Sequence, residues 1–279
     1  MSRAAGDPAL AALLLAPRID ALRALLAPRA AVLPPDDWLP VVVGGHEVGV
    51  AHPDVATFLG TEAHRFVLLD YRLVAEDEGL DFAGRSALLA DAARALREAG
   101  LLRGWRDELL DVRPHPDQAP IAAIERAACR TFGITTTAVH LNAFTPAGEV
   151  IVARRADHKQ IDPGLWDNLV GGMVPAGESE EAALAREAQE EAGLDLALLA
   201  PTRGGRVHVT RLVPEGYQSE IVQVFDAVLP DDLPLVNQDG EVAAIERKSV
   251  EQVLDAIAHD AFTLEAALVL LDGLRRRCP

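Results

Sequence analysis

The chain has 279 residues, a formal net charge of −17 at pH 7 and 49% hydrophobic residues. At roughly 100–200 residues per domain, this length predicts two domains. The acidic surface would repel polyanions, which excludes a general nucleic-acid binder, and the hydrophobic share excludes wholesale disorder. Cys129 and Cys278 lie far apart in the sequence. A disulfide scaffold or a zinc-thiolate site is therefore not expected, and the cytosol is the predicted location.

The first predicted element is a helix. Leucine and isoleucine recur at helical spacing over residues 10–26, with Pro17 as a break. The apolar run over residues 9–16 is too short to cross a bilayer. Arg18 follows this run, where a secretory signal needs its cleavage region. We therefore expect an amphipathic helix and no association with a membrane.

Short strands and one helix are predicted next. Residues 40–50 predict two strands around a diglycine turn, and residues 66–71 predict another strand. Residues 86–99 predict a helix that Ser86 caps and Gly100 ends. This part of the chain is therefore expected to be a small α+β domain.

A connector is predicted over residues 111–120, which are rich in proline and polar side chains. We place the domain boundary there, with an α+β accessory domain over residues 1–115 and a second domain over residues 116–279. A helix is predicted over residues 121–132. Four strands are predicted next, at residues 139–144, 149–154, 206–212 and 221–229. Two terminal helices follow, at residues 250–258 and 264–277.

Residues 171–194 carry the most informative pattern, GGMVPAGESEEAALAREAQEEAGL. Ser179 is a good N-cap, residues 182–192 are strong helix formers, and Gly193 suits the helix end. A helix therefore places Glu187, Glu190 and Glu191 on one face, at spacings of three and four residues.

Three carboxylates on one helix face repel one another, and a hard cation would relieve the repulsion. Carboxylate oxygens suit Mg²⁺, or Mn²⁺ as the alternative, and Mg²⁺ usually links carboxylates to substrate phosphates. Arg186 can hold a glutamate or a phosphate in a bidentate contact. A solvated acidic helix is the simpler explanation of a glutamate-rich segment, but it does not account for the spacing.

The pattern resembles the Nudix box: a glycine, five residues, a glutamate, seven residues, and then Arg-Glu-apolar-x-Glu-Glu-x-Gly-apolar. The residues that fill its nine positions are Gly172, Glu178, Arg186, Glu187, Ala188, Glu190, Glu191, Gly193 and Leu194. A larger apolar residue is more usual at Ala188. The resemblance implies an α/β/α sandwich with a mixed sheet and the hydrolysis of a small-molecule diphosphate.

The resemblance also implies roles for particular residues. Metal ligation falls to Glu187, Glu190 and Glu191, loop support to Gly172, Glu178 and Gly193, and orientation of a box glutamate to Arg186. Bound metal lowers the pKa of the attacking water, and a general base is needed as well. Glu241 lies where the family can carry a glutamate on a later loop. It is our candidate base, although its segment equally fits an ordinary turn before a strand.

A narrower resemblance extends over residues 154–179. The arginines, Lys159 and the Pro-Gly-Leu-Trp segment are similar to the Nudix group that processes thiamine diphosphate, whose members carry an extra N-terminal domain. This group includes the Nudix part of fungal thiamine pyrophosphokinase. It implies hydrolysis of thiamine diphosphate or its oxidised analogues to the monophosphate and phosphate. Arg154, Arg155, Lys159 and Trp166 are the predicted substrate-binding residues, with a solvated strand end and core packing as their alternatives.

Other functions compete with this hypothesis. A nucleotide-sugar or dinucleotide pyrophosphatase fits the same box, because substrate choice lies in loops outside it. A non-catalytic metabolite sensor is less favoured, since the box is complete. Isopentenyl diphosphate isomerase resembles the same region, but its cysteine and histidine are missing from residues 168–173. The sequence leaves open whether the chain forms a homodimer.

Overall fold

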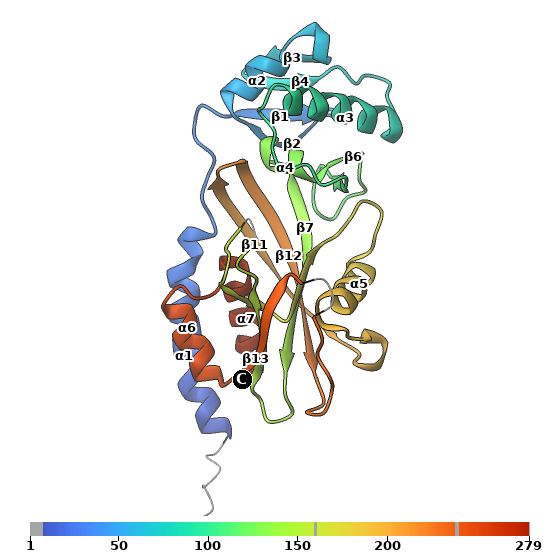
Figure 1. Ribbon diagram of the computed structural model, residues 1–279. Helices are drawn as coiled ribbons and strands as arrows, with labels where there is room; N and C mark the ends of the chain where they lie inside the picture. Colours follow the sequence, from blue (N-terminus) through green and yellow to red (C-terminus); the bar gives the residue numbers. More distant parts are fainter. Residues whose placement is uncertain (1–7, 159–160, 238–239, 279) are drawn as a thin grey trace, which may run out of the picture.

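A computed structural model of the chain describes residues 8–158, 161–237 and 240–278. A smaller α+β part, built on a four-stranded sheet, adjoins a larger part built on a seven-stranded mixed sheet (Figure 1). This arrangement confirms the predicted fold class, an α/β/α sandwich preceded by an α+β domain. No helix in the described ranges combines the length and the apolar character needed to cross a membrane.

The four-stranded sheet has the order β2-β1-β4-β3. Its strands are β1 (Leu39–Val43), β2 (His46–Ala51), β3 (Phe66–Leu69) and β4 (Arg72–Ala75). Strands β1, β2 and β3 confirm the predicted strands of this region, whereas β4 was not predicted. The helices of this part are α2 (Pro53–Leu59) and α3 (Phe82–Glu98), and short 3-10 turns lie at Ala27–Arg29 and Glu62–His64.

Helix α3 begins earlier than predicted. Asp81 caps it, because the Asp81 side chain accepts a hydrogen bond from the backbone N–H of Gly84. The predicted cap, Ser86, lies inside the helix, where its hydroxyl donates to the carbonyl of Phe82 and accepts from the N–H of Ala123. The role of Ser86 is therefore to tie the helix to the following strand.

The helix predicted over residues 121–132 is wrong in its first half. Residues Ala122–Glu125 form strand β6, which pairs antiparallel with β5 (Leu109–Val112), and only Arg126–Thr131 form helix α4. Strand β6 is buried throughout and lies against α3. This packing outweighs the helix propensity of its two alanines. Strand β5 also enters the predicted connector.

One hydrophobic cluster holds the elements of the α+β part together. It runs from Val41 to Ile134 in the sequence and includes Phe66, Leu89 and Phe132. Strands β5 and β6 and helix α4 contribute to it, so these elements pack with the N-terminal sheet. The boundary placed between residues 115 and 116 stays a prediction.

The larger sheet has the order β11-β12-β7-β8-β13, with β10 paired to β7 and β9 paired to β8. Strands β12 and β7 are parallel and the other pairs are antiparallel, so the sheet is mixed. The predicted hairpin and the two later strands are confirmed. The strands are β7 (Thr135–Phe144), β8 (Val150–Arg155), β9 (Trp166–Asn168), β10 (Val170–Met173), β11 (Thr202–Val213), β12 (Gly216–Val228) and β13 (Val242–Lys248).

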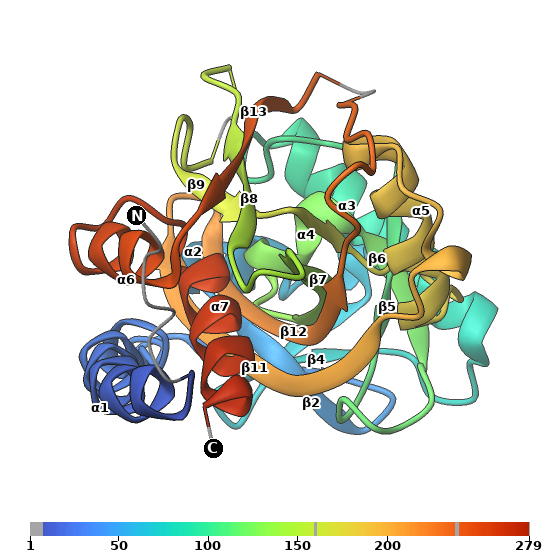
Figure 2. The same cartoon turned by 90° about the horizontal axis from the view of Figure 1, so that it is seen from below.

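Helices cover both faces of this sheet (Figure 2). Helix α5 (Glu180–Ala192) packs on one face, followed by a 3-10 turn at Leu196–Leu198. Helices α6 (Val250–Ala258), α7 (Leu264–Arg277) and α1 (Pro8–Leu26) form the other layer. The two terminal helices are confirmed.

Helix α1 joins the C-terminal layer although it comes first in the chain. Ile19, Leu22 and Leu26 are buried in the same cluster as residues of α6 and α7. The helix continues through Pro17, where the sequence predicts a break. The larger part therefore takes one of its helices from the N-terminal end of the sequence.

Candidate active site

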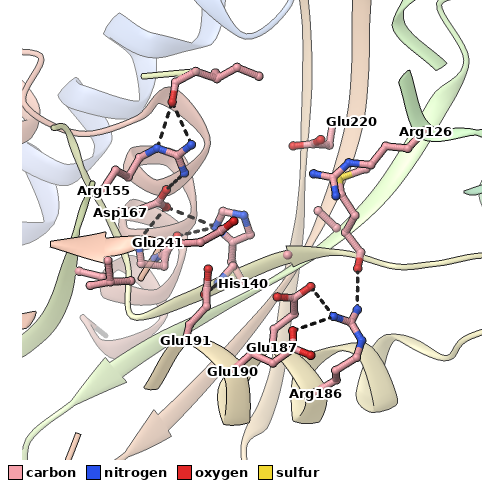
Figure 3. Close-up of a pocket in the computed structure, with 18 of the residues that line it drawn as sticks. Arg126, His140, Arg155, Asp167, Arg186, Glu187, Glu190, Glu191, Glu220 and Glu241 are labelled. Carbon is pink, nitrogen blue, oxygen red and sulfur yellow. Dashed lines mark hydrogen bonds and ion pairs between the residues drawn. The ribbon is translucent and has the colours of Figure 1, made fainter. Parts of the chain in front are cut away.

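A cavity of about 570 Å³ lies where the two parts of the molecule meet. Its wall includes helix α5, strands of the larger sheet, and Arg106, Glu108 and Arg126 from the N-terminal side (Figure 3). This volume falls in the range typical of small-molecule sites, roughly 300–1,000 Å³.

Helix α5 positions the acidic side of the cavity. The Ser179 side chain accepts from the N–H of Ala182 at 3.1 Å, and Gly193 ends the helix in the left-handed conformation with φ of 66°. Both predicted helix limits are therefore confirmed. The helix brings Glu187, Glu190 and Glu191 to the wall, as the residue spacing predicted.

Arg186 links four groups, two on helix α5 and two in the segment before it. Its Nη1 donates to Glu187 at 2.8 Å and to Glu190 at 3.3 Å, and its Nη2 donates to Glu178 at 3.2 Å and to the Met173 carbonyl at 3.3 Å. Burial opposes the charge of Arg186, but the hydrogen bond that it donates to Glu178 and the charge of Glu187 raise its pKa above the ordinary value. Arg186 therefore stays cationic and holds the acidic loop and helix together.

Two glycines allow the strand before α5 to approach the glutamates closely. A Cβ added at Gly172 would overlap the Glu187 carboxyl group. The N–H of Gly171 donates to Glu191 Oε2 at 2.9 Å. Burial raises the pKa of Glu187, although the Arg186 charge opposes the rise. Strand β10 therefore fixes two of the three predicted metal-binding carboxylates.

The carboxylate oxygens of Glu187, Glu190 and Glu191 are suitable ligands for a hard divalent cation, and all three residues line one cavity. In their present positions, Glu187 and Glu190 are turned to Arg186, and Glu191 is turned to Gly171. Within residues 8–158, 161–237 and 240–278, no group of three or more acidic, histidine or cysteine side chains is already arranged to hold a metal. Metal binding at these glutamates requires their side chains to turn inward.

The basic residues predicted from the sequence lie in different places. Arg155 is on the cavity wall, where it donates to Asp167 at 2.9 Å and to the Ile161 carbonyl at 2.9 Å. The Arg154 guanidinium instead lies by the Gly164 carbonyl and the Asp157 carboxylate. Lys159 lies outside the described residues.

Trp166 packs away from the cavity. It is partly buried against the hydrophobic cluster of the α6–α7 layer, and the Lys248 ammonium lies 3.9 Å from the centre of its ring. Among the described residues of the cavity wall, neither Trp166 nor Arg154 is present. The structure thus matches the alternatives weighed for these two residues, core packing and a solvated strand end.

Glu241, the candidate base, lies on the cavity wall at the start of the last strand. Its carbonyl accepts a hydrogen bond from the N–H of Ala156, which fixes this loop against the end of β8. Figure 3 shows its carboxylate on the side of the cavity away from Arg186. This position is compatible with the predicted role.

The sequence analysis missed His140, a buried residue of β7 on the cavity wall. Its Nδ1 lies 2.7 Å from Asn168 Oδ1, and the Asn168 amide donates to Asn142 Oδ1 at 2.8 Å. The Asn142 amide in turn donates to Asp226 at 2.9 Å and to the carbonyl of Val269. These acceptors fix the orientation of both amides.

The orientation of the two asparagines decides the tautomer of the neutral histidine. Asn168 presents its oxygen to His140, so Nδ1 of His140 carries the proton. The other ring nitrogen, Nε2, is then an acceptor on the side of Gly171, where an added Cβ would lie 3.0 Å away. The hydrogen-bond chain thus runs from the cavity through the sheet to Asp226 and its ion-pair partner, Arg276.

Other wall residues were also missed because they come from elements remote from the box. Arg126 begins helix α4 and forms an ion pair with Glu108 at 2.7 Å. Glu220 lies in the middle of β12 and is buried. The only sequence signal for Glu220 is a single acidic residue next to an apolar strand segment, which is a weak indication of a site.

Comparisons with known proteins agree with this arrangement. A family model described as NUDIX domain matches residues 134–268, and one described as domain of unknown function DUF4743 matches residues 28–136. The chain is 34% identical to the uncharacterized Nudix hydrolase PA4841 of Pseudomonas aeruginosa, over 54% of this chain and 80% of that protein. The chain belongs to the Nudix hydrolase family. Nudix hydrolases act on diphosphate substrates and generally use divalent metals.

Two further relatives differ in length and in name. Nudix hydrolase 20, chloroplastic, of Arabidopsis thaliana is 32% identical over 69% of this chain, which spans only 53% of that protein. Isopentenyl-diphosphate Delta-isomerase of Citrobacter koseri is 32% identical over 58% of this chain and 87% of that protein. The Nudix part of the chain is therefore shared with relatives of different named activities.

Proposed function

We propose that this Nudix protein is a divalent-metal-dependent hydrolase of a small organic diphosphate. The observation that carries the proposal is the meeting of Glu187, Glu190 and Glu191 with several arginines in one cavity. Among the described wall residues, seven are acidic and four are arginines. This excess of negative charge would repel a diphosphate unless cations entered with it, which supports the use of Mg²⁺ or Mn²⁺.

The three box glutamates would hold the metal, which supplies charge stabilisation at the diphosphate and a lower pKa for the attacking water. Arg186 orients Glu187 and Glu190, while Gly172 and Gly193 shape the two ends of the box. Arg155 and Arg126 are placed to bind phosphate oxygens. Glu241 takes the proton from water as an oxygen–phosphorus bond forms and the bridging phosphorus–oxygen bond breaks.

Thiamine diphosphate or an oxidised analogue is the proposed substrate, with the monophosphate and phosphate as products. Support comes from the resemblance over residues 154–179 and from an N-terminal domain preceding the Nudix domain. Arg155 has a place on the wall that suits this role, whereas Arg154 and Trp166 do not line it. A nucleotide-sugar or dinucleotide substrate is the alternative outcome of the test. A cytosolic location and a homodimer stay predictions.

The test is phosphate release from thiamine diphosphate, oxythiamine diphosphate, ADP-ribose, NADH and a nucleoside triphosphate, with Mg²⁺ and with EDTA. A phosphatase is added for the ADP-ribose and NADH assays, because their cleavage leaves monoesters. Glu190→Gln should lower kcat/KM by about 100-fold or more, since removal of a metal-binding carboxylate disrupts the charge balance at the diphosphate. The matched control is Glu181→Gln on the same helix, where Glu181 pairs with Arg203 outside the cavity.

Each outcome of this assay supports or overturns a different part of the proposal. Release confined to the thiamine compounds, dependent on Mg²⁺ and lost in Glu190→Gln but not in Glu181→Gln, supports the whole of it. Turnover of the nucleotide compounds alone keeps the hydrolase and overturns the thiamine substrate. Tight binding of one compound without turnover of any overturns hydrolysis and favours a sensor.

A further inference from the structure

A second, smaller cavity adjoins the active-site cavity at the junction of the two parts. Its volume is about 90 Å³, and its wall combines residues around α4 with residues of β12. We call it the junction cavity. The residues that line both cavities are Arg106, Arg126, Ile161, Met173 and Glu220. The two spaces therefore share one boundary, and a molecule bound at the box glutamates can extend into the junction cavity.

Glu220 is the acidic residue on that shared boundary. It lies in strand β12, opposite Thr136 of β7, and its side chain is buried with only 9% of the residue exposed. No described residue is recorded as a hydrogen-bond donor to its carboxyl group, whereas its neighbours Gln218 and Glu265 bond to each other at 2.9 Å. Figure 3 shows Glu220 beside Arg126, across the cavity from the box helix.

A buried carboxyl group without a hydrogen-bond donor is costly to keep in a folded protein. Burial raises the pKa of Glu220, and the nearby charge of Glu265 raises it further, while His140, Arg130 and Arg126 oppose the rise. In its protonated form, a carboxyl group offers a donor and an acceptor side by side. This pair of atoms matches a ligand group that has a nitrogen donor next to an acceptor.

The wall of the junction cavity is mixed in character. Leu110, Ile134 and Met173 contribute apolar surface, and four arginines contribute guanidinium groups, namely Arg103, Arg106, Arg126 and Arg130. A space of about 90 Å³ with this wall admits a compact flat ring, which can pack on the apolar side chains and stack on a guanidinium plane, but it is too small for a nucleoside. The phosphate end of such a ligand would remain near Arg126 and the box.

We propose that the junction cavity receives the organic group of the substrate, a small nitrogen heterocycle, and that Glu220 selects it through a hydrogen bond to a ring nitrogen or amino group. The inference rests on the proposed function, because it takes the box side of the cavity as the diphosphate site. It assigns substrate selection to the contact between the N-terminal part and the Nudix sheet.

The test compares two probes that share a diphosphate and differ in the organic group. Thiamine diphosphate carries an aminopyrimidine ring, and methyl diphosphate carries no ring. Binding is measured by calorimetry with Mg²⁺, and each probe carries a methylene group in place of the bridging oxygen of its diphosphate, so that it binds with its cations and no turnover occurs. Glu220→Leu, which keeps a side chain of similar size but offers no hydrogen bond, should weaken thiamine diphosphate binding about tenfold or more and change methyl diphosphate binding less than twofold, since a hydrogen bond is lost for one probe only.

A second variant and a control complete the experiment. Ala127→Leu fills the junction cavity from the α4 side without changing Glu220, and it should also weaken only the ring-bearing probe. Glu246→Leu makes the same change on the exposed strand β13 and should alter neither affinity. Thermal unfolding of each variant verifies that it is folded.

The outcomes distinguish this inference from the proposed function. Equal weakening of both probes by Glu220→Leu, or no weakening of either, overturns the role of Glu220. A wild-type protein that binds thiamine diphosphate and ADP-ribose no better than methyl diphosphate overturns the ring site. Selective binding that depends on Glu220 without any phosphate release supports the inference and rejects the hydrolase.

Discussion

The two acidic sides of the active-site cavity differ in how their charge is compensated. On the box side, Glu187 and Glu190 share the guanidinium of Arg186, and Glu191 accepts from a backbone N–H. On the opposite side, Glu220 is buried without a recorded hydrogen-bond donor among the described residues. The first side, which we call the charged side, pairs its carboxylates with a guanidinium and a backbone N–H, whereas burial on the second, the neutral side, favours an uncharged carboxyl. One cavity can therefore bind a cation and a neutral ring at its two ends.

The largest effect on hydrolysis should come from displacing the Glu187 carboxyl group on the charged side. Gly172→Ala would place a methyl group in the position of the Glu187 carboxyl. Since a shift of about 1 Å at a reacting group can cost 10²-fold, we expect Mg²⁺-dependent hydrolysis to fall about 100-fold. Thermal unfolding should change by only a few degrees, because Glu187 has a flexible side chain. Wild-type activity in this variant would contradict the placement of Glu187 in the metal site.

The second effect concerns the hydrogen-bond chain that runs from His140 on the cavity wall to Asp226. Asn142→Ala removes the acceptor of the Asn168 amide and a donor to Asp226. Leaving buried polar groups without partners costs roughly 1–3 kcal/mol each, so urea unfolding should show a loss of about 2–4 kcal/mol. The orientation of Asn168 would no longer be fixed, and the His140 tautomer with it. The tautomer is read from the ¹⁵N chemical shifts of the His140 ring at one pH, and identical shifts in the wild type and the variant would contradict this coupling.

The smallest effect tests the neutral side. Because the pKa of Glu220 is raised in the folded state, the folded protein holds this proton more tightly than the unfolded chain. The contribution of Glu220 to stability therefore falls as the pH rises above its ordinary value near 4.5. The groups that set this shift are Glu265, His140, Arg130 and Arg126.

Glu220→Gln should remove this pH dependence. We expect its melting temperature to exceed that of the wild type by about 2 °C or more at pH 8, and by less at pH 5. Differential scanning calorimetry at the two pH values measures the difference. Glu246→Gln is the control, and an equal shift in both variants would show that the effect is one of net charge.

The sequence predicted the charged side well because its determinants are local. Ser179, Gly193 and the glutamate spacing all lie within one helix and its ends, so a single segment determines the geometry. The neutral side depends on pairing between β12 and β7, which are far apart in the sequence. Neither His140 nor Glu220 belongs to a motif, and only the folded sheet brings them to the cavity.

The same distinction explains the errors in the N-terminal part. The strand β6 has a helix-favouring composition, and its conformation is decided by pairing with β5 and burial against α3. Both Ser86 and Asp81 are residue types that favour the N-cap position of a helix. Asp81 is the N-cap because its backbone is extended, as this position requires. Local propensity thus identified helix α3 but placed its N-cap five residues too late, and it assigned the residues of β6 to a helix.

The position of helix α1 has a consequence for the order of folding. Its apolar face is formed by Ile19, Leu22 and Leu26, whose packing partners lie in α6 and α7, which start at Val250 and Leu264. At a synthesis rate of roughly 5–20 residues per second, this face waits on the order of 10–50 s for its partners on a ribosome. The α+β part can collapse during that interval, whereas the outer layer of the sandwich closes last, when the two ends of the chain meet.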